Sequence, residues 1–208
     1  MALSEPYPLA FLSSILRVAS VQFDLIRFEE SSGAGSGQLW TSEMADPLWQ
    51  VDIAMADCPW SLAREINAKV KALGTMKSMH FSDASYSPAA GGVPGAGATI
   101  SAISADRTRI ALTGLPAAYR VTAGDRLNIN SGGASLYFGE FAETVNASGS
   151  GVTAQITITP PLPFSLATGA SVVMAAPVLR ARVGAFAPYT WQLGDYGAGA
   201  SLTLVQKR

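Results

Sequence analysis

Polar and apolar residues alternate most regularly between Trp49 and Met55. Trp49, Val51 and Ile53 fall on one side of an extended chain, and the residues between them are polar or small. A period of two is typical of a β-strand with one buried face. The pattern therefore predicts a strand whose core face carries Trp49, Val51 and Ile53.

The period becomes helical between Trp60 and Leu73. Leu62, Ile66 and Val70 recur at every fourth position, which places them on one side of an α-helix. Gly74 follows, and glycine is common directly after a helix because it adopts a left-handed conformation easily. We expect the helix to pack Leu62, Ile66 and Val70 against the sheet that contains the preceding strand.

Residues 21–41 predict a long β-hairpin. Segments rich in strand-forming residues flank Ser31–Gly37, which contains only Ser, Gly and Ala and is expected to form a tip that becomes ordered on assembly. Asp46-Pro47 predicts a turn between this hairpin and the strand at Trp49. The residues assigned to an assembly hairpin are Phe23, Leu25, Phe28, Gly33, Gly35, Gly37 and Trp40.

The composition changes after residue 86, which predicts two domains. Ser87–Ala98 is rich in Pro and Gly, as linkers are, and short strands separated by glycine turns follow it, as in a small barrel or sandwich. Residues 178–208 again contain large apolar residues that need a partner sheet. We expect 1–86 and 178–208 to form one domain and 87–177 to be inserted in it. The strands expected in the insertion are Thr99–Ser104, Arg109–Thr113, Arg126–Ile129, Ser135–Phe141, Val152–Thr159 and Ser171–Ala175.

Charge and composition exclude several classes of function. The net charge is −1, so there is no basic excess to hold a nucleic-acid backbone. Charged residues make up 14% of the chain, against about 25% in a typical soluble domain. One interpretation is that other subunits cover much of the surface, and the other is a compositional bias. A single Cys and a single His exclude an intrachain disulfide and a multi-histidine metal site, and there is no apolar stretch of membrane-spanning length.

The candidates for catalysis are weak, and no catalytic, metal or cofactor-binding residue is predicted. His80 and Asp83 lie three positions apart, on opposite faces of a strand. The same parity separates Glu140 from Glu143, so they do not predict a glycosidase pair. Of the four tryptophans, Trp49, Trp60 and Trp191 are expected in the core, and Trp40 is left open between core and surface.

The order of these segments resembles the distal tail and minor tail proteins of long-tailed bacteriophages and related prophages. Tyr7-Pro8-Leu9 precedes the first strand, Trp49 opens a strand before the helix, and a Pro/Gly linker leads into the β-module. Within that module the resemblance rests on Leu115-Pro116, Ala123-Gly124-Asp125-Arg126-Leu127, Leu136-Tyr137-Phe138, Gly151-Val152-Thr153, Pro160-Pro161-Leu162 and Gly169-Ala170-Ser171-Val172. The likeness spans nearly the whole chain, although each motif is loose.

The resemblance implies a mainly β fold with one α-helix. This would be a tail-tube-like β-sandwich with a flanking helix, and the inserted module would be a small β-barrel of oligonucleotide-binding or galectin-like type. It implies a ring of six copies at the tail tip of the virion, assembled in the bacterial cytoplasm. The implied partners are the tail tube protein, the tape-measure protein and the tail-tip hub protein. The position of the module inside the chain departs from the family pattern.

Two other classes of function stay open at this point. The inserted β-module is a candidate carbohydrate-binding module for a host surface glycan. A third and weaker hypothesis is a glycosidase-like enzyme that uses Glu140.

Overall fold

The computed structural model describes residues 4–33, 35, 37–90, 97–130 and 136–207. The chain divides into two compact units, Met1–Met79 with Ala181–Lys207 (unit 1) and His80–Arg180 (unit 2). The predicted domain boundaries, after residues 86 and 177, lie a few residues from these. Most of the Gly-rich part of the predicted linker, residues 91–96, lies outside the described residues.

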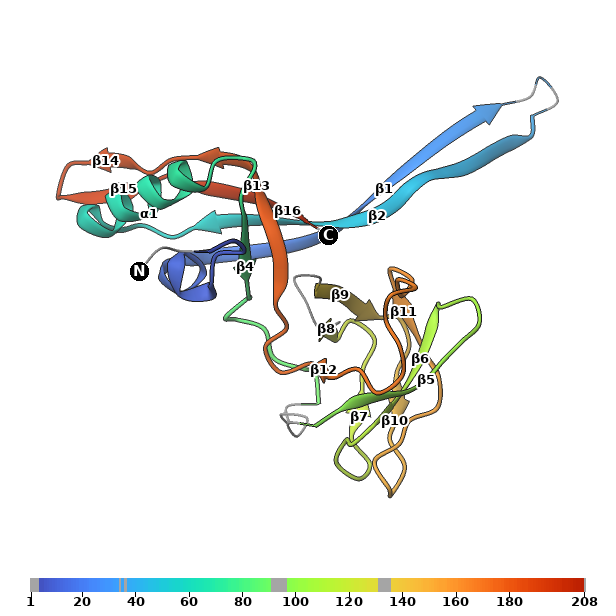
Figure 1. Ribbon diagram of the computed structural model, residues 1–208. Helices are drawn as coiled ribbons and strands as arrows, with labels where there is room; N and C mark the ends of the chain where they lie inside the picture. The colour runs from blue at the N-terminus through green and yellow to red at the C-terminus, as the bar shows by residue number, and fades with distance from the viewer. Residues whose placement is uncertain (1–3, 34, 36, 91–96, 131–135, 208) are drawn as a thin grey trace. The chain divides into compact units, whose positions relative to one another are not determined.

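Unit 1 is built on a five-stranded sheet with the strand order β1-β2-β16-β13-β4 (Figure 1). These strands span Val18–Gly33 (β1), Leu39–Met55 (β2), Ser78–Phe81 (β4), Leu179–Ala187 (β13) and Ser201–Gln206 (β16). β16 pairs with β2 on one side and with β13 on the other. The C-terminal segment thus joins the N-terminal strands in one sheet, which gives their large apolar residues the partner that they need.

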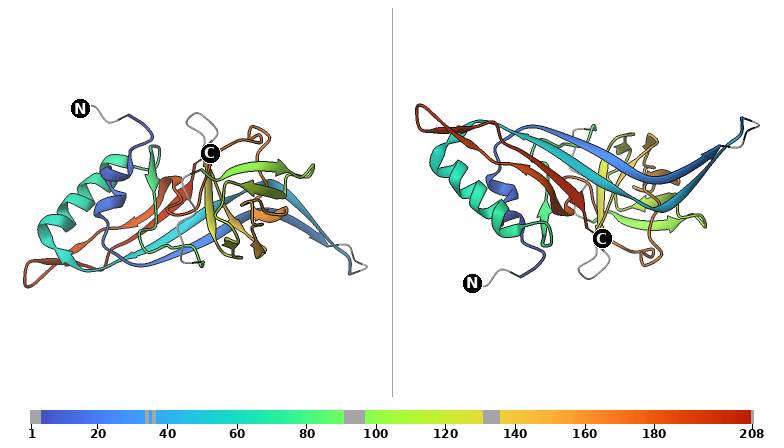
Figure 2. Two further views of the ribbon diagram at one scale, coloured as in Figure 1. Left: turned by 90° about the horizontal axis from the view of Figure 1, so that it is seen from below. Right: turned by 90° about the horizontal axis from the view of Figure 1, so that it is seen from above.

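A smaller sheet and one α-helix complete unit 1. The small sheet has the order β14-β15-β3, with β14 at Thr190–Gln192, β15 at Tyr196–Ala198 and β3 at Cys58–Pro59. The helix α1 runs from Trp60 to Leu73, on one side of the unit 1 strands (Figure 2). Before β1 the chain forms two short 3-10 turns, η1 at Leu9–Phe11 and η2 at Ser13–Ile15.

The core positions expected from the sequence are buried with one exception. Trp49, Val51 and Ile53 are buried on β2, as are Ile66 and Val70 on α1. Leu62 is only half-buried, and Ala63 occupies the buried position instead. The cause is a close approach of α1 to β15, because a Cβ atom at Gly197 would lie 2.5 Å from the Cβ of Ala63. Only a small side chain fits at that point of the helix.

The predicted turn at Asp46-Pro47 is wrong, because β2 continues through it. The pairing of β1 with β2 shifts here, from Ile26 opposite Leu48 to Phe28 opposite Ala45. Such a shift is a β-bulge, and bulges tolerate proline because the ladder is interrupted there. The predicted hairpin and the predicted strand at Trp49 are therefore one continuous pair of strands.

Unit 2 contains a six-stranded, nearly closed barrel-like sheet. Its order is β12-β8-β9-β11-β6-β5, with strands at Thr99–Ile103 (β5), Arg109–Thr113 (β6), Arg126–Asn130 (β8), Leu136–Phe141 (β9), Ile156–Thr159 (β11) and Val172–Val173 (β12). A separate pair consists of β7 (Arg120–Val121) and β10 (Val145–Asn146). The fold class expected from the sequence, mainly β with one α-helix, is confirmed over the described residues.

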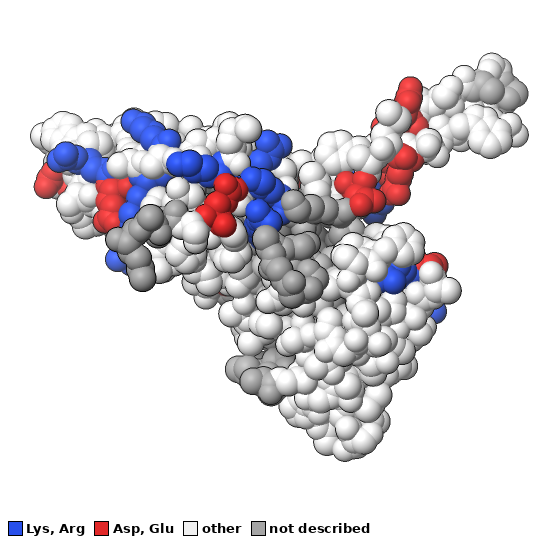
Figure 3. Space-filling model, in the orientation of Figure 1, with Lys and Arg blue, Asp and Glu red and all other residues white. Residues whose placement is uncertain are grey.

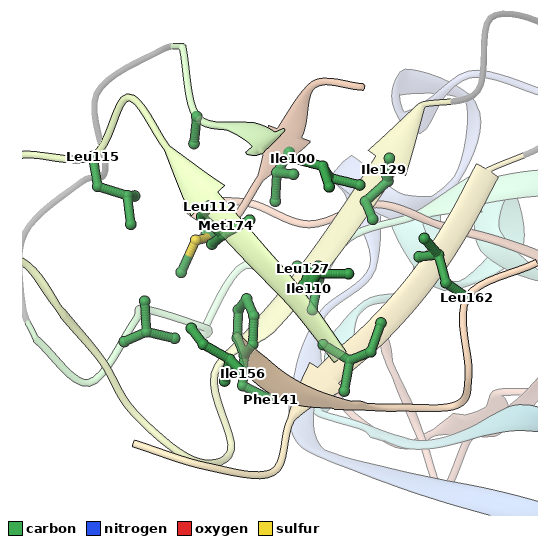
Figure 4. Packing of buried hydrophobic residues seen from close by; sticks show 14 of the residues in the cluster. Ile100, Ile110, Leu112, Leu115, Leu127, Ile129, Phe141, Ile156, Leu162 and Met174 are labelled. Atoms are coloured by element: carbon green, nitrogen blue, oxygen red, sulfur yellow. The ribbon is translucent and has the colours of Figure 1, made fainter. Parts of the chain in front are cut away.

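Hydrogen bonds between the two edge strands bring the barrel close to closure. A bridge joins Thr99 to Ser171, the Ile100 N–H donates to the Ala170 carbonyl at 3.0 Å, and the Val172 N–H donates to the Ala98 carbonyl at 2.8 Å. The interior is apolar (Figure 4). Its fully buried residues include Ile100, Ile110, Leu112, Val121, Leu127, Ile129, Phe141 and Ile156.

Replacing Ile66 by Ala should lower the free energy of unfolding of unit 1 by about 2 to 5 kcal/mol, the usual cost of emptying a buried site. Ile66 has no solvent exposure. All four tryptophans lie in unit 1, so their fluorescence during urea unfolding reports on this unit. Arg64→Ala, at an exposed position of α1, should change stability by less than about 0.5 kcal/mol. A loss that small for Ile66→Ala would contradict the packing of α1.

Replacing Gly151 by Ala should destabilise unit 2. Gly151 has a φ of +75°, and an added Cβ would lie 2.0 Å from the Leu115 carbonyl oxygen. Backbone strain and steric overlap together should cost roughly 2 to 5 kcal/mol. The matched control is Gly149→Ala, where an added Cβ meets nothing within 4 Å. Thermal unfolding followed by calorimetry should separate the two variants, and equal melting temperatures would contradict this prediction.

Candidate assembly surface

The outer half of the β1–β2 hairpin extends beyond the rest of the sheet (Figure 1). β16 pairs with β2 only from Gln50 to Ala54. Between Leu39 and Trp49, β2 therefore has β1 as its one strand partner within the described chain. We call the segment Arg27–Asp46 the arm, and all its described residues are exposed.

The arm carries large apolar side chains in solvent. Leu39 is 71% exposed, and Trp40 and Met44 are each 67% exposed. Phe28 adds a fourth, at 38%. An apolar patch on an exposed two-stranded ribbon is typical of a surface that binds another protein, because such side chains gain free energy when they are removed from water.

The structure divides the hairpin residues expected from the sequence into three groups. Phe23 and Leu25 are half-buried at the base, where the rings of Phe23 and Trp49 meet edge to face at 6.4 Å. Phe28 and Trp40 lie on the arm, and Gly33, Gly35 and Gly37 lie at its tip. The sequence analysis missed Leu39 and Met44. Their signal was the exposed apolar spacing just before Asp46, which a predicted turn appeared to explain.

Acidic residues surround the base of the arm. The arm contains Glu29, Glu30, Glu43 and Asp46 against one basic residue, Arg27, so its net charge is −3. The Arg27 guanidinium lies 3.8 Å from the Glu29 carboxylate and 3.6 Å from that of Glu43. On the face visible in Figure 3, the acidic groups gather near the base and the outer part of the arm is uncharged.

The opposite edge of the sheet, β4, is covered by the N-terminal segment. Tyr7 forms a bridge with Met79, and its N–H donates to the Ser78 carbonyl at 2.9 Å. The Glu5 carboxylate accepts hydrogen bonds from the Ser78 hydroxyl at 2.8 Å and from Lys207 Nζ at 2.7 Å. The edge that the described chain leaves uncovered is therefore β1, the strand that also forms half of the arm.

The ionisable residues weighed as catalytic candidates are engaged separately. Burial and the nearby Arg180 lower the pKa of His80. Asp83 forms an ion pair with Arg126 at 3.1 Å. Burial raises the pKa of Glu140, although Arg126 opposes this. Hydrogen bonds from Thr157 lower the pKa of Glu143.

The described residues contain no group of three His, Cys, Asp or Glu side chains that could hold a metal ion. Nor do they include a helix long and apolar enough to cross a membrane.

The tryptophans differ in part from expectation. Trp49 is buried and Trp60 is half-buried, but Trp191, expected in the core, is 53% exposed on β14. The reason is that β14 is an edge strand of the small sheet, and all three of its residues are exposed. In the described part of unit 2, Phe164 is the one strongly exposed aromatic side chain, so the aromatic surface is concentrated on unit 1.

Comparison with known proteins adds no family assignment. No model of a known protein family matches the chain, and no curated protein matches it in sequence.

The contribution of Glu5 to stability should depend on pH. Hydrogen bonds from Lys207 and Ser78 lower the pKa of Glu5 from 4.5 to about 2. A carboxylate with a lowered pKa stabilises the folded state above its unfolded pKa, and this contribution is lost as the pH falls through its folded pKa. The difference in unfolding free energy between the native chain and Glu5→Gln should therefore be constant above about pH 5 and shrink between pH 4.5 and about 2.

The Lys207→Ala variant is the companion measurement, because Lys207 is the main donor to Glu5. It should remove part of the same stabilisation. A difference for Glu5→Gln that stays the same down to the lowest pH would contradict this assignment.

Proposed function

We propose that this chain is a structural subunit that assembles with copies of itself through its arm. The observation that carries the proposal is the exposure of Leu39, Trp40 and Met44 on a ribbon without further strand partners in the described chain. A two-stranded hairpin is marginally stable alone in water, so an arm of this length gains most from packing against another molecule.

Two further observations support assembly. Charged residues are 14% of the chain, and stable subunit interfaces are depleted in charge at their centre. The open β1 edge lies along the same hairpin. Exposed edges of this length are a hazard in a monomer, but another subunit can pair with them.

The assembly that we propose is a ring, probably of six copies in the sense of the phage resemblance, at the distal end of a long-tailed bacteriophage tail. The resemblance in the order of the arm, helix, linker and β-module supports this assignment. On this proposal the tail tube protein, the tape-measure protein and the tail-tip hub protein are the neighbours. The subunit has a structural role and is located in the virion.

Replacing Trp40 by Ala should abolish assembly and leave the fold intact, because Trp40 is 67% exposed within the chain. Native mass spectrometry and negative-stain electron microscopy should show rings for the native chain and monomers for the variant. Circular dichroism should be the same for both.

The control is Met76→Ala, at an apolar residue of unit 1 that is 81% exposed and lies outside the arm. This variant should still assemble. If the native chain is a monomer at all concentrations, or if Trp40→Ala assembles normally, the proposed function is wrong.

A further inference from the structure

A shallow groove lies along the exposed side of α1. Its volume is about 700 Å³. Trp60, Arg64, Ala68 and Lys71 follow one another at spacings of four, four and three residues, so they share one face of the helix. The full lining is Trp60, Ser61, Arg64, Glu65, Asn67, Ala68 and Lys71.

The groove is cationic with an apolar part. Glu65 is paired with Lys69 at 2.7 Å, which compensates its charge. Within the described chain, Arg64 and Lys71 form no salt bridge, and both are exposed. Trp60 and Ala68 provide apolar surface between these charges. Figure 3 shows basic side chains gathered over this part of unit 1.

The arm has the complementary properties. It has a net charge of −3, and its exposed apolar residues are Leu39, Trp40 and Met44. Residues alternate between the two faces of a strand, and Ser32 pairs with Trp40 whereas Glu30 pairs with Ser42. Glu30 and Trp40 therefore lie on the same face of the ribbon, so one face offers both an acidic group and an indole.

The arm of one molecule does not reach its own groove. β2 has 17 residues, and at about 3.3 Å per residue it spans roughly 55 Å. The arm tip lies at one end of β2, and α1 begins shortly after the other end, at Trp60. Figures 1 and 2 show the tip and α1 at opposite ends of unit 1. An arm in this groove must come from another molecule.

We propose that the groove on α1 receives the arm of a second copy of this chain. Trp40 packs on Trp60 and Ala68, and the acidic groups Glu30 and Glu43 face Arg64 and Lys71. The contact joins two different surfaces, so it is head-to-tail, and repetition of such a contact forms closed rings when the rotation between subunits closes. The inference rests on the proposed function, to which it adds the surface that receives the arm.

Reversing charges on one surface and then on both tests this contact. Arg64→Glu with Lys71→Glu should weaken assembly roughly tenfold or more, because like charges then meet across the interface. Glu30→Lys with Glu43→Lys should do the same. All four substitutions in one chain restore opposite charges and should recover assembly, measured by sedimentation velocity at low salt. Arg109→Glu with Arg120→Glu makes the same change at exposed positions of unit 2 and should have no effect.

Cross-linking tests the contact directly, because a disulfide forms only when the two Cα atoms approach within about 7 Å. Trp40→Cys and Ala68→Cys chains of different mass are mixed under oxidising conditions and should form a mixed dimer. The native Cys58 is buried. A mixture of Trp40→Cys with Ala167→Cys, an exposed position in unit 2, should not react.

The outcomes separate this inference from the proposed function. If Trp40→Ala prevents assembly but the groove variants assemble normally and no mixed disulfide forms, the groove is the wrong receptor and the assembly role stands. If neither the arm nor the groove variants affect assembly, both proposals fail. Weakening by either pair of reversals without recovery in the fourfold variant overturns the pairing of these charges.

Discussion

The pairing of β2 with β16 is the constraint on which unit 1 depends. Over Gln50–Ala54, β2 lies between β1 and β16, and the Thr203 hydroxyl donates to the Asp52 carboxylate at 2.7 Å across this pair. At the end of the pairing, the side chain of buried Gln206 accepts a hydrogen bond from the Trp49 N–H at 3.2 Å. This side chain supplies the acceptor for a buried backbone group where β16 ends, since such groups are costly to leave unpaired. The fixed segment of β2 holds the base of the arm in one direction.

The parts of the fold that depend on local periodicity could be predicted from the sequence. Trp49, Val51 and Ile53 alternate in phase, and Ile66 and Val70 share one helical face, so their burial follows from the pattern alone. The barrel strands were also visible, since Arg109–Thr113 has the predicted bounds. The short bounds of β11 and β12 were not, because pairing with neighbouring strands decides where a strand ends.

The errors have a common physical cause, because each depends on a neighbour that is distant in the sequence. Pro47 predicts a turn by itself, yet the β-bulge opposite Phe28 accommodates it within a strand. Leu62 fits the helical period, yet the approach of Gly197 favours the smaller Ala63. Trp191 has the composition of a core residue, yet β14 lies at a sheet edge. The length of the arm was missed for the same reason, since a turn at Pro47 would have ended it.

The distribution of apolar residues along β2 explains how one strand can serve both stability and assembly. From Trp49 to Met55 every second side chain is buried, and this half contributes to the core of unit 1. From Leu39 to Asp46 every residue is exposed, so this half contributes little to the stability of the isolated chain. Association can then remove Leu39, Trp40 and Met44 from water without any rearrangement of the core. Because the inner half is already ordered by β16, the arm loses less conformational entropy on binding than a free hairpin would, and more of the gain from burial remains for affinity.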